Sequence, residues 1–271
     1  MQELTYDLPG GVIAAVLFVS TALAVEIGYR LGARMAYQTE EAMRAHVRTI
    51  QGAILGILAI VLGFTLSLAL QRYDSRCEAV VAEANAIGTA YLRAQLLPAG
   101  VKEKALGGLR AYVDLRVEAG RATLADHGAR QAGERDTAAA QAALWDIARR
   151  AVAFDPAPVT SGLFVQAVND AIDSASRREA ALDRHVPEAV LILLYACLLL
   201  AGGIVGYTTG IEGHRPSLAG YLLAALIVVL VFITLDLDRP RRGFVHVSQK
   251  PLLDLQAQVH SRENAANASA R

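Results

Sequence analysis

Four long stretches of this 271-residue chain carry no charged side chain, and they constrain its fold more than any other feature. They cover residues 8–25, 49–71, 189–211 and 216–235. A helix needs about 20 apolar residues to cross the hydrocarbon core of a bilayer. A helix in the core of a water-soluble protein would carry charge along one face over such a length. The sequence therefore predicts an all-α integral membrane protein with four transmembrane helices.

The spacing of these stretches predicts the domain organisation. A first transmembrane hairpin is expected over 1–71, with spans at about 9–28 and 50–71, followed by a helical extramembrane domain over 72–187. A second hairpin is expected over 188–236, with spans at about 188–210 and 216–236, and then a membrane-proximal C-terminal segment and disordered tail over 237–271. Pro98 and the Pro-rich stretch 155–158 predict breaks between helices of the extramembrane domain, and 127–133 predicts a linker.

Several glycines in the predicted spans are four residues apart. They are Gly28 and Gly32, Gly52 and Gly56, and Gly202, Gly206 and Gly210. Because small residues let helix backbones approach closely in lipid, we expect helix contacts at these positions. Glu26 lies at the end of the first span, one turn before Arg30, which predicts an interfacial ion pair.

Basic residues beside the spans bear on the orientation in the membrane. The side that holds the extramembrane domain and both termini carries Arg72, Arg76, Arg177, Arg178, Arg184, Arg239, Arg241, Arg242 and Lys250. The other side carries Arg30, Arg34, Arg44, Arg48 and Arg215. Cytoplasmic loops carry an excess of Lys and Arg, so the total predicts a cytoplasmic insert and cytoplasmic termini. The first hairpin alone favours the reverse, because its loop holds four of these arginines.

No pattern typical of catalysis or metal binding occurs in the sequence. It has no nucleophile elbow, no phosphate-binding glycine loop and no metalloprotease helix, and its six histidines are scattered. Cys77 and Cys197 are isolated, which predicts two small buried side chains. The equal numbers of acidic and basic residues argue against nucleic-acid binding. We therefore expect no enzyme activity, no catalytic residue, no metal site and no cofactor.

The second predicted span holds candidate pore residues. Ile60, Phe64 and Leu68 are four residues apart and lie on one side of a helix. In a ring of identical subunits, such a stripe forms a hydrophobic constriction that gates by dewetting. Apolar residues at this spacing in a span more often face lipid or a neighbouring helix.

Two further stretches carry a family resemblance. One is Gly63-Phe64 followed by the segment 72–93, and the other is the segment 236–253. With the order of the spans, they resemble the bacterial bestrophin-like domain family, long catalogued as a domain of unknown function, over about residues 10–256. Bestrophins are pentameric, anion-selective channels with four spans per subunit and a pore lined by the second span. The resemblance implies a homo-oligomer in the bacterial inner membrane, with a pentamer as one arrangement. This assembly would pass chloride or another small anion.

The two stretches contain the residues of the membrane-proximal family motif. These are Arg72, Arg76, Glu83, Asn85, Asp236, Asp238 and Arg239. One hypothesis is a brace at the membrane surface, in which Asp236, Asp238 and Arg239 pair with Arg72, Arg76 or Glu83 and Asn85 bridges helices; an ion vestibule is the alternative. Animal bestrophins bind calcium after the last span, but arginines interleave with the acids here and argue against a cation site.

Two functions follow from these patterns. The first is a homo-oligomeric anion channel with the second span lining the pore. The second is a non-conducting membrane scaffold or sensor whose helical insert binds a partner. A ring with second spans on its axis would favour the channel, whereas a monomer or simple dimer would favour the scaffold.

Overall fold

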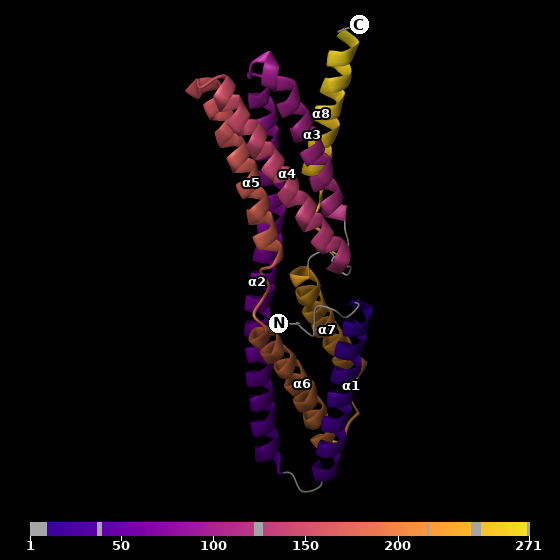
Figure 1. Cartoon of the computed structure of the whole chain (residues 1–271). Coiled ribbons are helices and arrows are strands. Elements are labelled where there is room, and N and C mark those ends of the chain that lie inside the picture. The colour runs from indigo at the N-terminus through magenta and orange to yellow at the C-terminus, as the bar shows by residue number, and fades with distance from the viewer. Residues whose placement is uncertain (1–9, 37–39, 122–126, 216, 240–244, 270–271) are drawn as a thin grey trace. The chain divides into compact units, whose positions relative to one another are not determined.

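The computed structural model describes residues 10–36, 40–121, 127–215, 217–239 and 245–269. Their regular structure is entirely helical (Figure 1). The elements are α1 (Gly10–Met35), α2 (Glu41–Ala94), α3 (Ala99–Arg121), α4 (His127–Phe154), the π-helical turn η2 (Pro158–Gly162), α5 (Leu163–Leu182), α6 (Glu188–Ile211), α7 (Leu218–Asp238) and α8 (Lys250–Ser269). The chain forms two compact units, a membrane unit of residues 1–73 and 185–245 and a bundle unit of residues 74–184 and 246–271.

Four helices of the described chain are long and apolar enough to cross a membrane. They are α1, α2, α6 and the Gly220–Asp238 part of α7. Large apolar side chains such as Phe18, Ile192 and Leu222 are more than half exposed on their surfaces. An apolar surface of this extent is typical of contact with lipid and not with water. This protein is therefore an all-α integral membrane protein, as the uncharged stretches predicted.

Glycines bring α1 and α6 into backbone contact within the membrane unit. A Cβ atom at Gly28 would lie 2.0 Å from the carbonyl oxygen of Gly203, and one at Gly206 would lie 2.0 Å from that of Val25. Gly32 and Gly210 meet the facing backbone in the same way further along, so the two helices run parallel. The predicted close contacts are thus confirmed at these glycines.

The other predicted glycine pair behaves differently. A Cβ atom at Gly52 or Gly56 would meet nothing within 4 Å in the described chain. At these two positions α2 has no close neighbour among the described residues. The predicted Glu26–Arg30 ion pair forms, with 2.6 Å between Oε1 and Nε.

The bundle unit encloses a separate core. The C-terminal part of α2 packs with α3, α4, α5 and α8 around fully buried side chains such as Ile87, Leu109, Tyr112 and Phe164. The predicted breaks occur where expected: α2 ends at Ala94, before Pro98, and α4 ends at Phe154. Pro has no amide donor and disfavours helical geometry at the preceding residue, which explains both ends.

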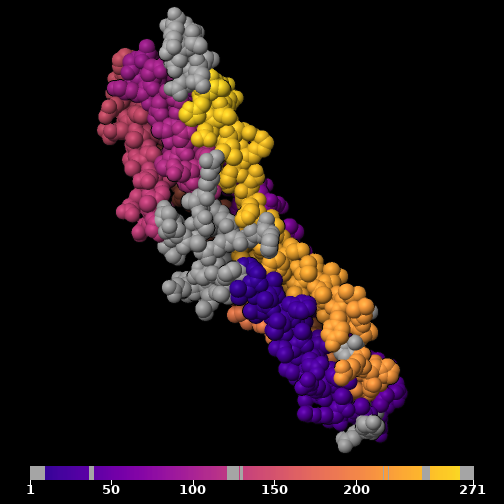
Figure 2. Space-filling view, turned by 90° about the vertical axis from the view of Figure 1, so that its right-hand side faces the viewer, coloured from indigo at the N-terminus to yellow at the C-terminus, as the bar shows by residue number. Residues whose placement is uncertain are grey.

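Disorder was expected for the last residues, from about 261 to 271, and this expectation is wrong for 261–269, which are helical. The C-terminal segment is helical from Lys250 to Ser269 and lies along α3 in Figures 1 and 2. Leu252, Leu255 and Val259, spaced three and four residues apart, are buried in the bundle core.

The prediction of a linker over 127–133 is also wrong, because α4 begins at His127. Two glycines in this stretch weaken a helix by about 1 kcal/mol each. The good helix formers around them and the packing of the following turns offset that cost. The expected span starts at residues 9 and 216, the arginines at 241 and 242 and the end of the tail at 270–271 lie outside the described residues.

Candidate functional site

Helix α2 is one uninterrupted helix (Figure 1). Its side chains divide into a buried and an exposed face. The buried face includes Leu58, Leu62, Thr65, Ala69, Arg76, Val80, Glu83, Ile87, Ala90 and Ala94. Consecutive members are three, four or, between Ala69 and Arg76, seven residues apart, so they stay on one side of the helix over about ten turns. The opposite side is exposed along the same length when only the described residues are considered.

The candidate pore residues lie on this exposed side within the membrane unit. Ile60 and Phe64 are 61% and 71% exposed, whereas Leu68 is 36% exposed. Each residue of an α-helix turns by about 100°, so Leu68 lies about 80° around the helix from Ile60. Ile60 and Phe64 therefore project from the centre of the open face, and Leu68 lies at its edge.

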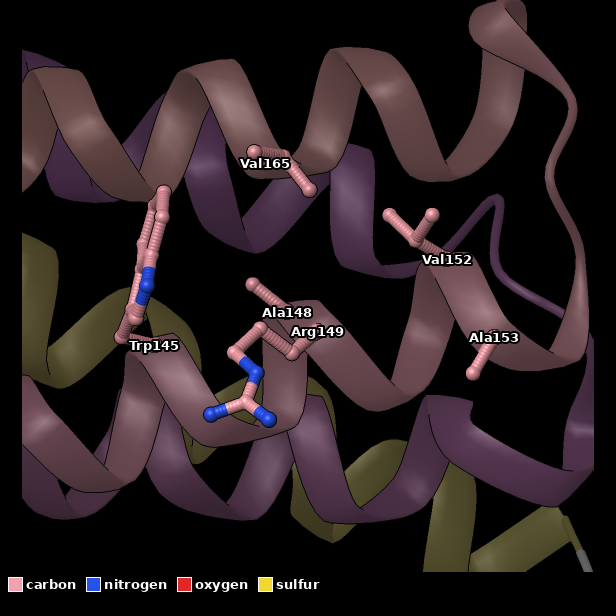
Figure 3. A pocket seen from close by; sticks show the side chains of 6 residues that line it. All are labelled: Trp145, Ala148, Arg149, Val152, Ala153 and Val165. Carbon is pink, nitrogen blue, oxygen red and sulfur yellow. The ribbon is translucent and has the colours of Figure 1, made fainter.

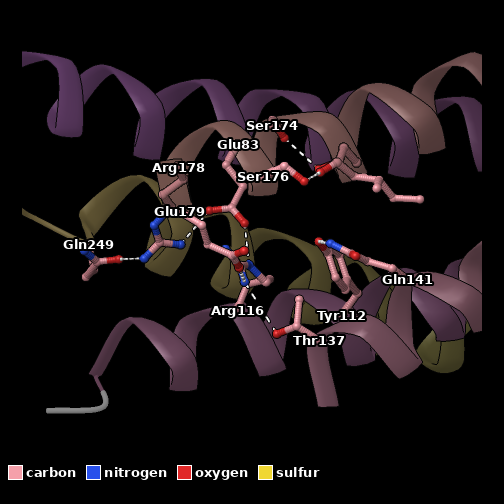
Figure 4. A network of polar contacts seen from close by, with 12 residues as sticks. Glu83, Tyr112, Arg116, Thr137, Gln141, Ser174, Ser176, Arg178, Glu179 and Gln249 are labelled. Carbon is pink, nitrogen blue, oxygen red and sulfur yellow. Dashed lines mark hydrogen bonds and ion pairs between the residues drawn. The ribbon is translucent and has the colours of Figure 1, made fainter. Parts of the chain in front are cut away.

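A buried charge network occupies the bundle unit (Figure 4). Glu83 of α2 is fully buried, and each of its carboxylate oxygens accepts a charged hydrogen bond. Arg116 of α3 donates to Oε1 through Nε, and Arg178 of α5 donates to Oε2 through Nη1 at 2.5 Å. The Arg116 and Arg178 side chains are only 4% and 3% exposed. One carboxylate thus ties three helices together.

Neutral and half-exposed groups complete the hydrogen bonds of this network. Arg116 also reaches Glu179 at 3.2 Å, and Arg178 donates to Gln249 Oε1 at 2.6 Å. Gln249 directly precedes α8, so the network includes the C-terminal segment. A Cβ atom at Gly120 would lie 2.7 Å from Gln249 Oε1, so glycine leaves the space that the amide fills.

The network shifts the titration of two of its members. Burial by itself would lower the pKa of Arg116, but the charge of Glu83 and its hydrogen bond raise the pKa above the ordinary value. Burial also raises the pKa of the Tyr112 hydroxyl, which accepts a hydrogen bond from Gln141. Arg116 therefore stays charged and Tyr112 stays neutral at physiological pH.

The remaining buried motif residues bind backbone groups at helix ends. In the bundle unit, Arg76 donates to the carbonyl oxygens of Ala181 and Arg184 at 3.2 and 2.8 Å, where α5 ends. In the membrane unit, both oxygens of Asp238 accept from the Val186 amide at 3.0 and 3.1 Å, just before α6. These charges complement the helix dipoles, since a cation faces a C-terminus and an anion faces an N-terminus.

The residues of the brace hypothesis differ in the partners that the structure gives them. Glu83 is paired with arginines of α3 and α5, so its partners are not the ones expected. Asp236 accepts from the Val245 amide at 3.0 Å, and Arg239 is buried. Asn85 is exposed, and neither it nor Arg72 forms a side-chain hydrogen bond with the described residues. Pairing among the other motif residues stays a prediction.

Arg116, Arg178 and Gln249 were not among the predicted site residues. A helical signal for Arg178 was available: it follows Ala171, Ser174 and Ala175 on the apolar face of α5. A charge on an otherwise apolar face indicates a buried partner. The identity of that partner depends on which helices pack together, and the sequence pattern does not contain this information.

The bundle unit also has an apolar groove between α4 and α5 (Figure 3). Its volume is about 320 Å³, and it is lined by Trp145, Ala148, Arg149, Val152, Ala153 and Val165. Arg149 supplies the charged group at the groove. Within the described ranges, no group of three or more His, Cys, Asp or Glu side chains could hold a metal ion.

Comparisons with known proteins agree with this architecture. A crystal structure of a membrane protein with one leucine-to-alanine substitution has a TM-score of 0.55 to this chain at 15% identity, covering 91% of this chain and 98% of the other. At this identity the likeness concerns the fold alone. No curated protein matches the chain. The family described as "Bestrophin-like domain" matches residues 16–252. This integral membrane protein therefore belongs to the bestrophin-like family.

Proposed function

We propose that this protein is a homo-oligomeric ion channel whose α2 helices surround the conducting axis. The observation that carries the proposal is the open face of α2, on which Ile60 and Phe64 are largely exposed in the part of the chain that the structure describes. In a ring of subunits these side chains would form a hydrophobic neck, which closes by dewetting. Gly56 and Gly52 on the same helix leave room for a neighbouring subunit.

Further features of the proposal come from family membership and charge. A bestrophin-type assembly is a pentamer in the bacterial inner membrane, with the bundle unit and both termini in the cytoplasm as the basic residues favour. Membership implies chloride or another small anion as the permeating ion. The proposed function requires no enzyme activity and no cofactor.

The variant Phe64→Ala tests the neck. Removing a ring of phenyl groups widens the constriction and lowers the cost of wetting it, so we expect a larger current than in the wild type. The expected increase is on the order of ten-fold, which corresponds to about 1.4 kcal/mol of barrier. The measurement is electrical recording from purified protein in planar bilayers.

Leu222→Ala is the matched control, because Leu222 is an exposed apolar residue of α7. It should leave the current unchanged. If neither the wild type nor Phe64→Ala conducts although both are inserted, the channel proposal is wrong.

The second candidate is a non-conducting scaffold or sensor, and the groove beside Trp145 supports it. An apolar groove on a water-exposed bundle suits the apolar face of a partner helix. Native mass spectrometry in detergent separates the two candidates. A ring of five or more copies would favour conduction, and a monomer or dimer without an axial opening would favour the scaffold.

A further inference from the structure

An apolar groove lies between α1 and α7 within the membrane unit. Its volume is about 220 Å³. It is hollow because alanines line it, Ala22 on α1 and Ala224 and Ala225 on α7, beside larger neighbours such as Phe18. An unfilled hollow of this size forfeits dispersion contacts of the side chains around it. Both helices are candidate membrane spans, so the groove opens toward lipid and not toward water.

Thr21 is the polar residue that α1 contributes to the wall of this groove. It is 4% exposed, and its Oγ1 has no hydrogen-bond partner among the described residues. Other buried hydroxyls of the spans donate to the carbonyl oxygen four residues earlier, as Thr65 and Thr234 do at 2.7 and 2.8 Å. The Thr21 methyl group faces α6, because a Cβ atom at Gly202 would lie 3.4 Å from Cγ2, so the hydroxyl is on the branch turned away from Gly202. A buried hydroxyl without an acceptor is unfavourable, which indicates that an acceptor is missing.

The groove lies at the depth where lipid head groups give way to acyl chains. Thr21 precedes Glu26 by five residues, which is about 7.5 Å along the helix. Glu26 and Arg30 form an exposed ion pair, which marks the membrane surface. The head-group region is roughly 5–7 Å thick on each side of the hydrocarbon core, so Thr21 lies near the ester oxygens of a phospholipid. Tyr221 supports this depth, because it lines the same groove three residues into α7 and aromatic side chains gather at the membrane interface.

A positive charge precedes α7 at the same end of the groove. Arg215 is exposed two residues before Ser217, the N-cap of α7, and its side chain forms no hydrogen bond or ion pair with the described residues. The nearest acidic residue in the sequence, Glu212, is already paired with Arg48 at 2.8 Å. The positive end of the α7 dipole adds to the charge of Arg215. This end of the groove therefore attracts a negatively charged group.

We propose that the groove between α1 and α7 is a binding site for an anionic phospholipid of the bilayer. The acyl chain fills the hollow that the alanines form, an ester oxygen accepts a hydrogen bond from Thr21, and the phosphate lies beside Arg215. A lipid with no net charge lacks the attraction to Arg215. The proposal is independent of ion conduction, because it needs neither a pore nor a second copy of the chain.

The test is native mass spectrometry of the purified full-length protein, equilibrated in micelles with equal amounts of phosphatidylglycerol and phosphatidylcholine. One arginine beside an anionic lipid favours binding by about five-fold, so the wild type should retain phosphatidylglycerol over phosphatidylcholine by about this factor. Arg215→Gln should bring the ratio of the two retained lipids close to one. Equal retention of both lipids by the wild type would overturn the proposal.

Two further variants test the groove itself. The phenyl group of Ala22→Phe occupies the hollow and should lower the amount of both retained lipids by about ten-fold. Thr21→Val keeps the shape of the side chain but removes the hydroxyl, and it should lower the retained amount by about five-fold.

Ala196→Phe is the matched control, because Ala196 is an exposed residue of α6 that does not line the groove. It makes the same change in another span and should leave the retained lipid unchanged. An Ala22→Phe protein that retains as much lipid as Ala196→Phe would overturn the proposal. If the thermal midpoint shows that the phenyl group at residue 22 disturbs the fold, Thr21→Val decides, and retention at the wild-type level by that variant would overturn the proposal.

Discussion

Replacing Gly206 with alanine is expected to destabilise the membrane unit by more than about 3 kcal/mol. The added Cβ atom would lie 2.0 Å from the carbonyl oxygen of Val25, which belongs to the backbone of α1 and cannot rotate away. Accommodating it requires α1 and α6 to separate along the contact that Gly28 and Gly32 share. The measurement is the thermal unfolding midpoint of the purified protein in detergent, together with the yield of monodisperse protein.

Gly52→Ala is the control for this prediction. A Cβ atom there would meet nothing within 4 Å, and alanine favours the helix over glycine by about 0.5–1 kcal/mol. The same chemical change should therefore be neutral or stabilising in α2. A Gly206→Ala protein with the wild-type midpoint would show that the two helices are not in backbone contact.

The second large effect is expected for Glu83→Gln. This substitution keeps the size of the side chain but leaves the buried guanidinium groups of Arg116 and Arg178 without their shared counter-charge. Breaking a buried ion pair by removing one partner costs about 3–5 kcal/mol. We expect a corresponding drop in the midpoint of urea unfolding, followed by tryptophan fluorescence of Trp145, which lies in the same unit.

Glu179→Gln provides the comparison within the same network. The Glu179 side chain is 51% exposed, so solvent screens its pairing with Arg116, and its loss should cost less than about 1 kcal/mol. Equal effects from the two variants would mean that burial does not set the strength of the network. In that case Glu83 would not be the group that joins α2, α3 and α5.

The sequence was sufficient for the spans because lipid imposes a simple requirement. A helix surrounded by hydrocarbon cannot carry charge at depth, so an uncharged stretch of sufficient length indicates a span. The same logic identified the glycines that pack α1 on α6, since small residues are needed wherever two backbones meet. It predicted helix contacts equally at Gly28 and at Gly52, because the spacing of glycines does not say which helices face each other.

The bundle unit was predicted less completely. Its helical character and its breaks at Pro98 and at 155–158 follow from local chemistry. The sequence showed only a moderately apolar stretch after the last span, whereas in the structure Leu252 and Leu255 lie in the core of the bundle unit, where α8 contacts α3. A short amphipathic helix is only marginally stable in isolation, and it is stabilised by the surface that it packs against.

The sequence by itself determined that this chain lies in a membrane, how many times it can cross and which family it belongs to, because these depend on local hydrophobicity and on motifs. Only the tertiary structure decided that Glu83 binds two arginines, that Arg76 and Asp238 cap helix ends, and which side of α2 stays open. The physical reason is that a charge finds its partner, and a helix its buried face, through contacts between residues far apart in the chain.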